Sequence, residues 1–268
     1  MLRALWTSAS GMIAQQTNLD VVTHNLANVN TQGYKKHRAD VEDLLYQVWR
    51  EPGTPVEPNS TVPTGVQVGL GTRVTATPSF MTQGNFQITD NPLDWAIAGQ
   101  TMAGENAFFQ VTQPDGTIAY TRAGSWSIDG DGQIVSEDGM LLEPAMIVPQ
   151  DAVSVQLSRS GRVSVTMPGE TEPQEIGQLE LARFINPAGL RALGDRLFLE
   201  TAASGAPILG QPGEDGMPTV RQGVLEMSNV QVVEEMVGMI VAQRAYEANS
   251  KGIQTADELL RIANSLKR

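Results

Sequence analysis

The stretch that decides the fold is residues 2–26, which read LRALWTSASGMIAQQTNLDVVTHNL. Its apolar positions recur at helical spacing and form one stripe at Leu2, Leu5, Ala9, Met12, Leu19 and Leu26. This spacing predicts an amphipathic α-helix. The helix is expected to end in the cluster 28–33, whose Asn and Gly residues suit left-handed C-cap geometry.

The last stretch of the chain repeats this pattern. Residues 230–268 read VQVVEEMVGMIVAQRAYEANSKGIQTADELLRIANSLKR, with an apolar stripe at Val230, Val233, Val237, Val241, Ala245, Ala248, Ala256, Leu259, Ala263 and Leu266. Residues 228–229 are the expected N-cap, with acidic residues in the first turns and basic residues at the end, as the helix dipole favours. A second long helix is therefore predicted to close the chain.

Between the helices the pattern changes to short alternating runs. Segments 153–157 and 163–165 alternate apolar and polar residues around a Ser160, Gly161 turn, and Asp-Gly pairs recur at 115–116, 131–132 and 138–139. Such runs and turns are typical of strands and hairpins. We expect a β-rich domain over residues 74–200.

Two further segments read as extended connectors, residues 35–73 and 201–227. Residues 51–63 of the first hold four prolines, Pro52, Pro55, Pro58 and Pro63, and residues 202–218 of the second are rich in Gly and Pro. The predicted fold class is α+β: a helical domain of residues 1–34 with 228–268, the connectors, and a central β-rich domain. The terminal helices are expected to pair as an α coiled-coil layer, with each other or with neighbouring chains; the alternative is that the paired helices fold back and cap their own β domain.

Charge and composition exclude several classes of function. A net charge of -12 and a pI of about 4.6 argue against a nucleic-acid partner, because phosphate binding depends on clustered Lys and Arg. No run of about 18 apolar residues occurs, so no membrane insertion is expected. Polar Thr7 and Ser8 interrupt the first apolar positions, so no cleaved signal peptide is expected.

No residue pattern predicts catalysis, a cofactor or a metal. The two histidines, His24 and His37, have no triad-like motif near them and are interpreted as surface or interface residues. Asp129 and Asp131 approximate a calcium loop, but Asp138 stands where a Glu is expected, so a hairpin turn is the better interpretation. Neighbouring carboxylates on a turn have no pocket, which argues against a hydrolase.

One run of basic residues stands out against this acidic background. Residues 35–38 read KKHR, and four residues are too few for nucleic-acid binding in so acidic a chain. We interpret the run as a solvated face or as a contact with an acidic neighbouring subunit.

The motif at the end of the first helix, NLANVNTQGYK at residues 25–35, resembles the signature of the flagellar rod and hook protein family. Further matches follow in order: GNFQ at 84–87, NPLD at 91–94, FFQV at 108–111, YTR at 120–122, NPAGL at 186–190, EMSNV at 226–230 and QRAYEAN at 243–249. DLLYQ at 43–47 and PTGVQVG at 63–69 are most similar to the branch that forms the distal rod. Two departures are His24, where the family commonly has Asn, and an apparent insertion at residues 100–107.

This resemblance implies a structural subunit of the flagellar basal body, exported by the flagellar type III apparatus without a cleaved signal. It implies a rigid tubular polymer that crosses the periplasm and transmits torque to the hook, with the helices inside and the β domain outside. The implied partners are further copies of the chain, proximal rod proteins, hook or hook-junction proteins and the surrounding rings. A proximal rod or hook subunit is the alternative within the family.

The resemblance and the apolar stripes together give a set of expected interface residues. The expected subunit contacts are Leu2, Leu5, Met12, Leu19, Asn25, Leu26, Asn28, Val233, Val237, Ile240, Tyr246 and Leu259. The four connector prolines are expected to stiffen the shaft.

Overall fold

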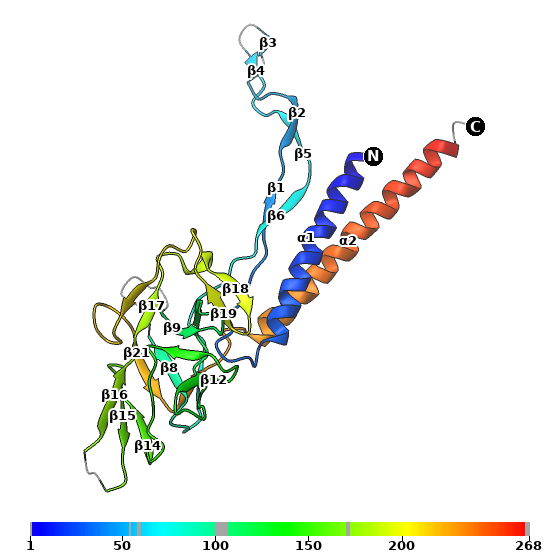
Figure 1. The fold of residues 1–268 in the computed structure, drawn as a ribbon. Coiled ribbons are helices and arrows are strands. Elements are labelled where there is room, and N and C mark those ends of the chain that lie inside the picture. Colours follow the sequence, from blue (N-terminus) through cyan, green and yellow to red (C-terminus); the bar gives the residue numbers. More distant parts are fainter. Residues whose placement is uncertain (1, 54, 58–59, 100–106, 170–171, 266–268) are drawn as a thin grey trace. The chain divides into compact units, whose positions relative to one another are not determined.

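The computed structural model describes residues 2–53, 55–57, 60–99, 107–169 and 172–265. It confirms an α+β chain, with a helix at each end and a large β-rich region between them (Figure 1). The chain divides into two compact units. The helix–ribbon unit consists of residues 1–26, 37–78 and 232–268, and the β-rich unit of residues 27–36 and 79–231.

Both helices form where their periodicity places them. Helix α1 spans Leu2–Ala27, and the chain then turns through Gly33, whose φ of 66° is a left-handed conformation that glycine adopts without strain. Helix α2 spans Val232–Ser265. The N-cap expected at residues 228–229 is wrong, because the helix begins later and the Asn229 side chain bonds to Lys36 N and Phe80 O instead.

Residues 40–76 fold back on themselves as a two-stranded ribbon, where the sequence suggested a single extended connector. The ribbon is built from three antiparallel pairs: β1 (Asp40–Asp43) with β6 (Thr72–Ala76), β2 (Tyr46–Arg50) with β5 (Val66–Gly69), and β3 (Pro55–Glu57) with β4 (Ser60–Thr61). A two-stranded ribbon without further packing is at best marginally stable. It therefore needs neighbours to hold it.

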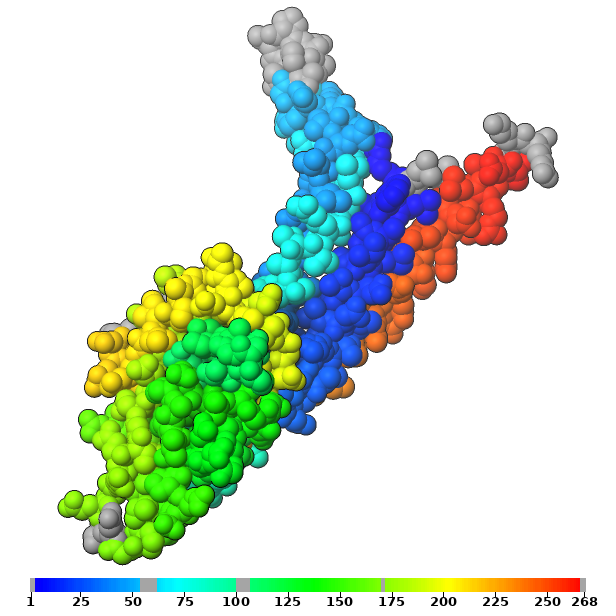
Figure 2. Space-filling view, viewed as in Figure 1, coloured from blue at the N-terminus to red at the C-terminus, as the bar shows by residue number. Residues whose placement is uncertain are grey.

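One such neighbour is helix α1. Ser10 Oγ accepts a hydrogen bond from Thr72 N at 3.2 Å, and Gly71 packs against Ser10 and Thr7. Figure 2 shows the cyan strands of the ribbon beside the blue helix, with orange α2 on the other side of α1. Near the N-terminus the guanidinium of Arg3 lies 5.1 Å from the ring centroid of Trp49. One face of α1 is thus occupied by the ribbon.

The β-rich unit contains the main hydrophobic core. Nine of the described strands form one sheet, in the order β11 (Trp126–Ile128), β12 (Ile134–Ser136), β13 (Leu141–Glu143), β9 (Ala107–Thr112), β10 (Ile118–Thr121), β19 (Leu197–Leu199), β18 (Arg191–Gly194), with β17 (Leu181–Arg183) on β9 and β20 (Ile208–Gly210) on β17. A 3₁₀ turn, η1 (Pro187–Gly189), precedes β18. Fully buried side chains such as Trp95, Phe109 and Leu142 pack on one side, and Phe108, Tyr120 and Phe184 form a second cluster.

The remaining strands extend this unit. A three-stranded sheet contains β14 (Ser154–Leu157), β15 (Arg162–Thr166) and β16 (Gln174–Gln178), which confirms the hairpin predicted around Gly161. Two pairs join β21 (Thr219–Gln222) to β8 (Trp95–Ala98) and β22 (Val224–Glu226) to β7 (Phe86–Ile88). The three strands β20, β21 and β22 therefore pair with earlier strands, where the sequence suggested an extended connector over 201–227.

Candidate assembly surface and buried charge network

The two terminal helices of the helix–ribbon unit contact each other along an antiparallel seam (Figure 1). The contacting pairs keep one register: Ser8 with Gly252, Gly11 with Asn249, Val22 with Gly238, and Asn25 with Glu235. The steps of 3, 11 and 3 residues along α1 are matched by equal steps backward along α2. Most of these residues are small or polar, so the helices approach closely but bury little apolar surface in the seam.

Asn25 is a buried residue of the seam whose side-chain nitrogen and oxygen are both hydrogen-bonded. Its side-chain amide donates to Glu235 Oε2 at 3.1 Å and to His37 O at 2.8 Å, and its oxygen accepts from His37 N at 2.9 Å. Asn25 and Glu235 are both buried. The expected interface residue Asn25 therefore fastens α1, α2 and the segment that leads into the ribbon to one another.

The apolar residues of α2 that lie outside the seam remain exposed. We call these residues the outer face of α2, and they have exposed fractions of 51 to 74 %: Val233, Met236, Val237, Ile240, Val241, Leu259 and Ile262. On α1, Trp6 and Ile13 are likewise exposed. A helix of a globular protein normally turns its apolar stripe inward, whereas α2 turns most of its large apolar residues outward. Apolar patches exposed in this way mark interaction sites.

The structure places the expected interface residues in two groups. Val233, Val237, Ile240, Tyr246 and Leu259 of α2 are exposed. Most of the expected residues of α1 are half-buried, namely Leu5, Met12, Leu19 and Leu26. Asn28, which follows the helix, is half-buried too. The side chain of Leu2 lies outside what the structure describes. That these residues contact neighbouring subunits stays a prediction.

The connector prolines surround the tip of the ribbon. Pro52 follows β2, Pro55 opens β3, and Pro63 follows β4, while Pro58 and most of the insertion at 100–107 lie outside the described residues. The adjoining strand β2 is exposed along its whole length and carries Trp49. The ribbon thus presents further apolar surface beyond its contact with α1.

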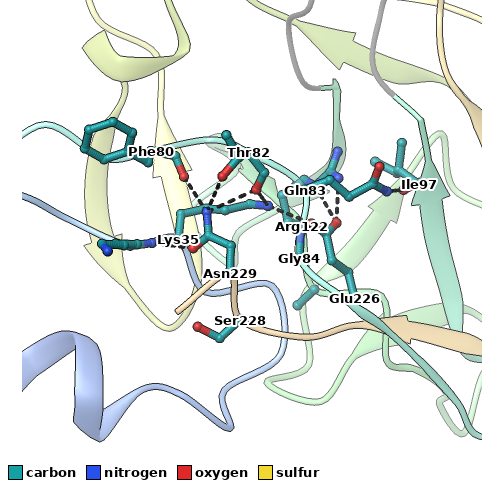
Figure 3. Close-up of polar contacts among 12 residues, drawn as sticks. Lys35, Phe80, Thr82, Gln83, Gly84, Ile97, Arg122, Glu226, Ser228 and Asn229 are labelled. Carbon is teal, nitrogen blue, oxygen red and sulfur yellow. Dashed lines mark hydrogen bonds and ion pairs between the residues drawn. The ribbon is translucent and has the colours of Figure 1, made fainter. Parts of the chain in front are cut away.

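A buried charge network lies within the β-rich unit, and nothing in the sequence pattern predicted it (Figure 3). Glu226, at the end of β22, accepts hydrogen bonds from two cations. Its Oε1 accepts from Lys35 Nζ at 2.6 Å. Its Oε2 accepts from Arg122 Nε at 2.9 Å and from a terminal nitrogen of Arg122 at 2.5 Å. All three side chains are at most 1 % exposed. The interpretation of residues 35–38 as a solvated basic run is therefore wrong for Lys35.

The network has few unsatisfied groups. Glu226 Oε1 also accepts from Gly84 N at 2.9 Å, Lys35 Nζ donates to Thr82 O at 2.8 Å, and Arg122 donates to Ala107 O at 2.6 Å. A Cβ on Gly84 would lie 1.9 Å from Met227 O, so only glycine allows the two backbones to come this close. Partners of this kind are needed because an unpaired charge in the interior is strongly destabilising.

Burial and charge shift the titration of these groups in opposite senses. Burial lowers the pKa of Lys35 to about 8, with the nearby Arg122 acting in the same direction. Burial would raise the pKa of Glu226, but the positive charges of Arg122 and Lys35 outweigh it and lower this pKa below its usual value. The carboxylate is therefore ionised at neutral pH, and it balances one of the two cations.

The residues weighed as chemical groups do not assemble into a catalytic site. Asp129 Oδ1 accepts hydrogen bonds from Asp131 N at 3.0 Å and from Gln133 N at 2.8 Å. The Asp129 side chain thus stabilises a turn. The rings of His24 and His37 lie 6.2 Å apart in an edge-on arrangement. Across the described residues, no group of three or more His, Asp or Glu side chains is placed to hold a metal ion, and no helix is long and apolar enough to span a membrane.

The comparisons with known proteins agree with the terminal motifs. Three family descriptions match: "Flagella basal body rod protein" over residues 5–35, "Flagellar hook protein FlgE/F/G D1 domain" over 102–165, and "Flagellar basal body rod FlgEFG protein C-terminal" over 221–266. The flagellar basal-body rod protein FlgG of Borreliella burgdorferi is 52 % identical over the whole of both chains. The chain belongs to the FlgG family.

Two further relatives support this assignment. FlgG of Caulobacter vibrioides is 46 % identical over 99 % of this chain and all of its own length. The flagellar hook protein FlgE of Borreliella burgdorferi matches over both full lengths, but at only 23 % identity. FlgG is the distal rod protein, so the chain is a structural subunit of the flagellar distal rod and not an enzyme. The hook alternative is accordingly disfavoured.

Proposed function

We propose that this chain assembles with further copies of itself into a rigid helical tube that transmits torque along the distal rod. In this tube α1 and α2 pair as coiled-coil helices of an inner layer, and the β-rich unit lies outside. The chain passes between the two layers after Leu26, Lys36, Pro78 and Gln231. By family, the ends of the tube meet proximal rod proteins and hook or hook-junction proteins, and its outer wall faces the basal-body rings.

The outer face of α2 is the observation that carries this proposal. Each residue that it exposes becomes favourable to bury when another chain covers it, by about 25 cal/mol per Å² of apolar area. In contrast, the described part of the helix–ribbon unit buries only four apolar side chains, Ala14, Val22, Ala242 and Ala256. Such a small interior cannot offset the conformational entropy lost when two long helices become ordered. Neighbouring subunits supply the missing contacts.

The two helices expose different surfaces, which favours an open polymer. The ribbon and α2 occupy two sides of α1, and Trp6 and Ile13 lie on a side that neither covers. If the α1 surface of one copy packs against the α2 surface of the next, the contact joins unlike patches. Repeated contacts between unlike patches generate rings or helical filaments.

The substitution Val237→Asp tests this proposal. Val237 lies on the outer face of α2 and is 54 % exposed, so a charge there should leave the isolated chain folded. In the tube it would be desolvated without a partner, at a cost of several kcal/mol. We expect cells carrying Val237→Asp to export the subunit but to build no distal rod, as scored by electron microscopy of basal bodies and by swimming.

The matched control is Gln243→Asp, which introduces the same charge at an exposed polar position of the same helix. It should build a normal rod. Normal motility of the Val237→Asp strain would remove the outer face of α2 from the subunit interface.

A further inference from the structure

The covalent chain passes between the two units four times, after Leu26, Lys36, Pro78 and Gln231. On the side of the β-rich unit, these passages lead into three segments: residues 27–36, the segment that begins at Ser79, and the segment that ends at Gln231. Force that travels along the covalent chain from the helices or the ribbon enters the β-rich unit through these segments. Their attachment to the sheet is therefore mechanically important.

The buried charge network binds all three segments at one place (Figure 3). Lys35 belongs to the first segment, Thr82 and Gly84 to the second, and Glu226 to the third, and hydrogen bonds of 2.6 to 2.9 Å join them. Arg122 then connects Glu226 to Ala107 O, at the start of the central strand β9. The network thus reaches from the three segments into the nine-stranded sheet.

A second set of bonds joins the same segments beside the charges. Asn229 Oδ1 accepts from Lys36 N at 2.7 Å, and its amide donates to Phe80 O at 2.8 Å and Thr82 O at 3.1 Å. Phe80 N donates to Lys36 O at 2.7 Å, and Gly33 N donates to Glu226 O at 2.8 Å. The three segments are therefore cross-linked to one another at several points.

We propose that the Lys35–Arg122–Glu226 network is the joint through which force on the terminal helices passes into the β-rich unit. Without it, segments under load would be peeled from the sheet one at a time. With it, Glu226 of the third segment holds the Lys35 cation of the first segment, the Gly84 amide of the second and the Arg122 cation that follows β10 of the sheet, so the segments bear load together. An apolar cluster of the same size would have no directional bonds to backbone groups. The inference rests on the proposed role as a torque-transmitting subunit.

Hydrogen exchange of the isolated chain measures whether the network fastens the segments. Glu226→Gln keeps the shape of the side chain but leaves two buried cations without a counter-charge. We expect amide exchange at Gly33, Gly84 and Lys36 to rise by at least about tenfold, because these amides are protected by local closure of the joint. The control Leu142→Ala opens a cavity in the core of the same unit and should not raise exchange selectively at these three amides.

Rotation under load then separates a mechanical role from simple stability. Strains carrying Glu226→Gln should rotate near the wild-type speed at low load and stall or lose hooks in viscous medium. The Leu142→Ala strain, with comparable or lower thermal stability, should keep its rotation at high load. If Glu226→Gln fails to fold, the triple substitution Lys35→Met, Arg122→Met and Glu226→Met replaces it, since apolar side chains can substitute for buried charges without loss of the fold.

The outcomes are distinct. Selective loss of rotation at high load in either network variant supports the joint, and high-load rotation equal to that of Leu142→Ala, with unchanged exchange, overturns it. If the wild-type chain fails to restore a rod in a strain that lacks its distal rod subunit, the proposed function fails. The exchange comparison on the isolated chain still decides whether the network holds the three segments.

Discussion

At the scale of single residues, Glu226 joins the two cations of the buried charge network in the β-rich unit. Its carboxylate is buried, it neutralises part of the charge of Lys35 and Arg122, and it also accepts a bond from the backbone of Gly84. Removing one member of such a cluster leaves an uncompensated charge in the interior, which costs about 3–5 kcal/mol. Loss of any single member of the network should therefore destabilise the β-rich unit, whereas replacement of all three members by apolar residues of the same volume could leave it stable.

The pH dependence of unfolding gives a direct test of this carboxylate. Because the folded-state pKa of Glu226 is lowered, its stabilisation is present above the unfolded pKa of about 4.5 and is lost as the pH falls through the folded pKa. We expect the melting temperature of Glu226→Gln to lie roughly 10 °C below wild type at pH 7. The gap should shrink as the pH falls below the unfolded pKa, since protonated Glu226 resembles Gln. A gap that stays constant down to pH 3, measured by circular dichroism, would contradict the assignment.

At the scale of elements, the ribbon is the feature that could make the shaft straight, a property that the pairing of the terminal helices does not account for. Three strand pairs extend it from β1 and β6 to β3 and β4, and prolines flank its tip. Proline restricts the backbone and lacks the amide that would continue a ladder, so we predict that these positions stiffen the tip and limit further pairing. A stiff ribbon inserted between neighbouring subunits would favour a single packing arrangement and hence a straight shaft.

Deletion of residues 51–62 tests the role of the ribbon tip. The deletion removes Pro52, Pro55 and Pro58 but leaves α1, α2 and the contact of Ser10 with Thr72 in place. We expect export and polymerisation to continue, because both helices keep their exposed apolar residues. The shaft should become curved or bendable in electron micrographs of isolated basal bodies. A straight rod of normal diameter in the deletion strain would exclude the tip from the mechanism of rigidity.

At the scale of the whole molecule, the two units differ in how much they bury. The β-rich unit has a large apolar interior that includes Trp95, Phe109 and Leu181, each fully buried. The helix–ribbon unit has a seam of small and polar residues and an exposed apolar outer face. Local stability follows buried apolar contacts, so the two units should open at very different free energies.

Limited proteolysis of the isolated chain measures this difference. At low concentration we expect cleavage first within residues 1–26, 37–78 and 232–265, with a resistant fragment that retains residues 79–231. In assembled rods the same sites should be protected, since neighbouring subunits cover them. A full-length monomer that resists the protease at both ends would show that the helices are stable on their own β-rich unit, and it would weaken the proposal of folding on assembly.

The sequence by itself determined the features that depend on neighbours along the chain. Helical spacing gave α1 and most of α2, Asp-Gly and Ser-Gly turns gave the hairpins around Gly116, Gly139 and Gly161, and the ordered motifs gave the family. These features are local because periodicity and turn chemistry act over a few residues. The exposed residues Val237 and Leu259 of α2 were also among those expected from the stripe.

The tertiary structure alone decided which distant residues meet. Lys35 and Glu226 are 191 positions apart. Lys35 stands in the basic run of residues 35–38, and this local pattern predicted a solvated side chain. The motifs around Lys35, Arg122 and Glu226 were each recognised, but no spacing rule joins three separate segments. Likewise, only packing shows that the helices meet at pairs such as Gly11 with Asn249 and Ser8 with Gly252. Burial depends on the surfaces that a fold brings together, and a one-dimensional pattern does not contain that information.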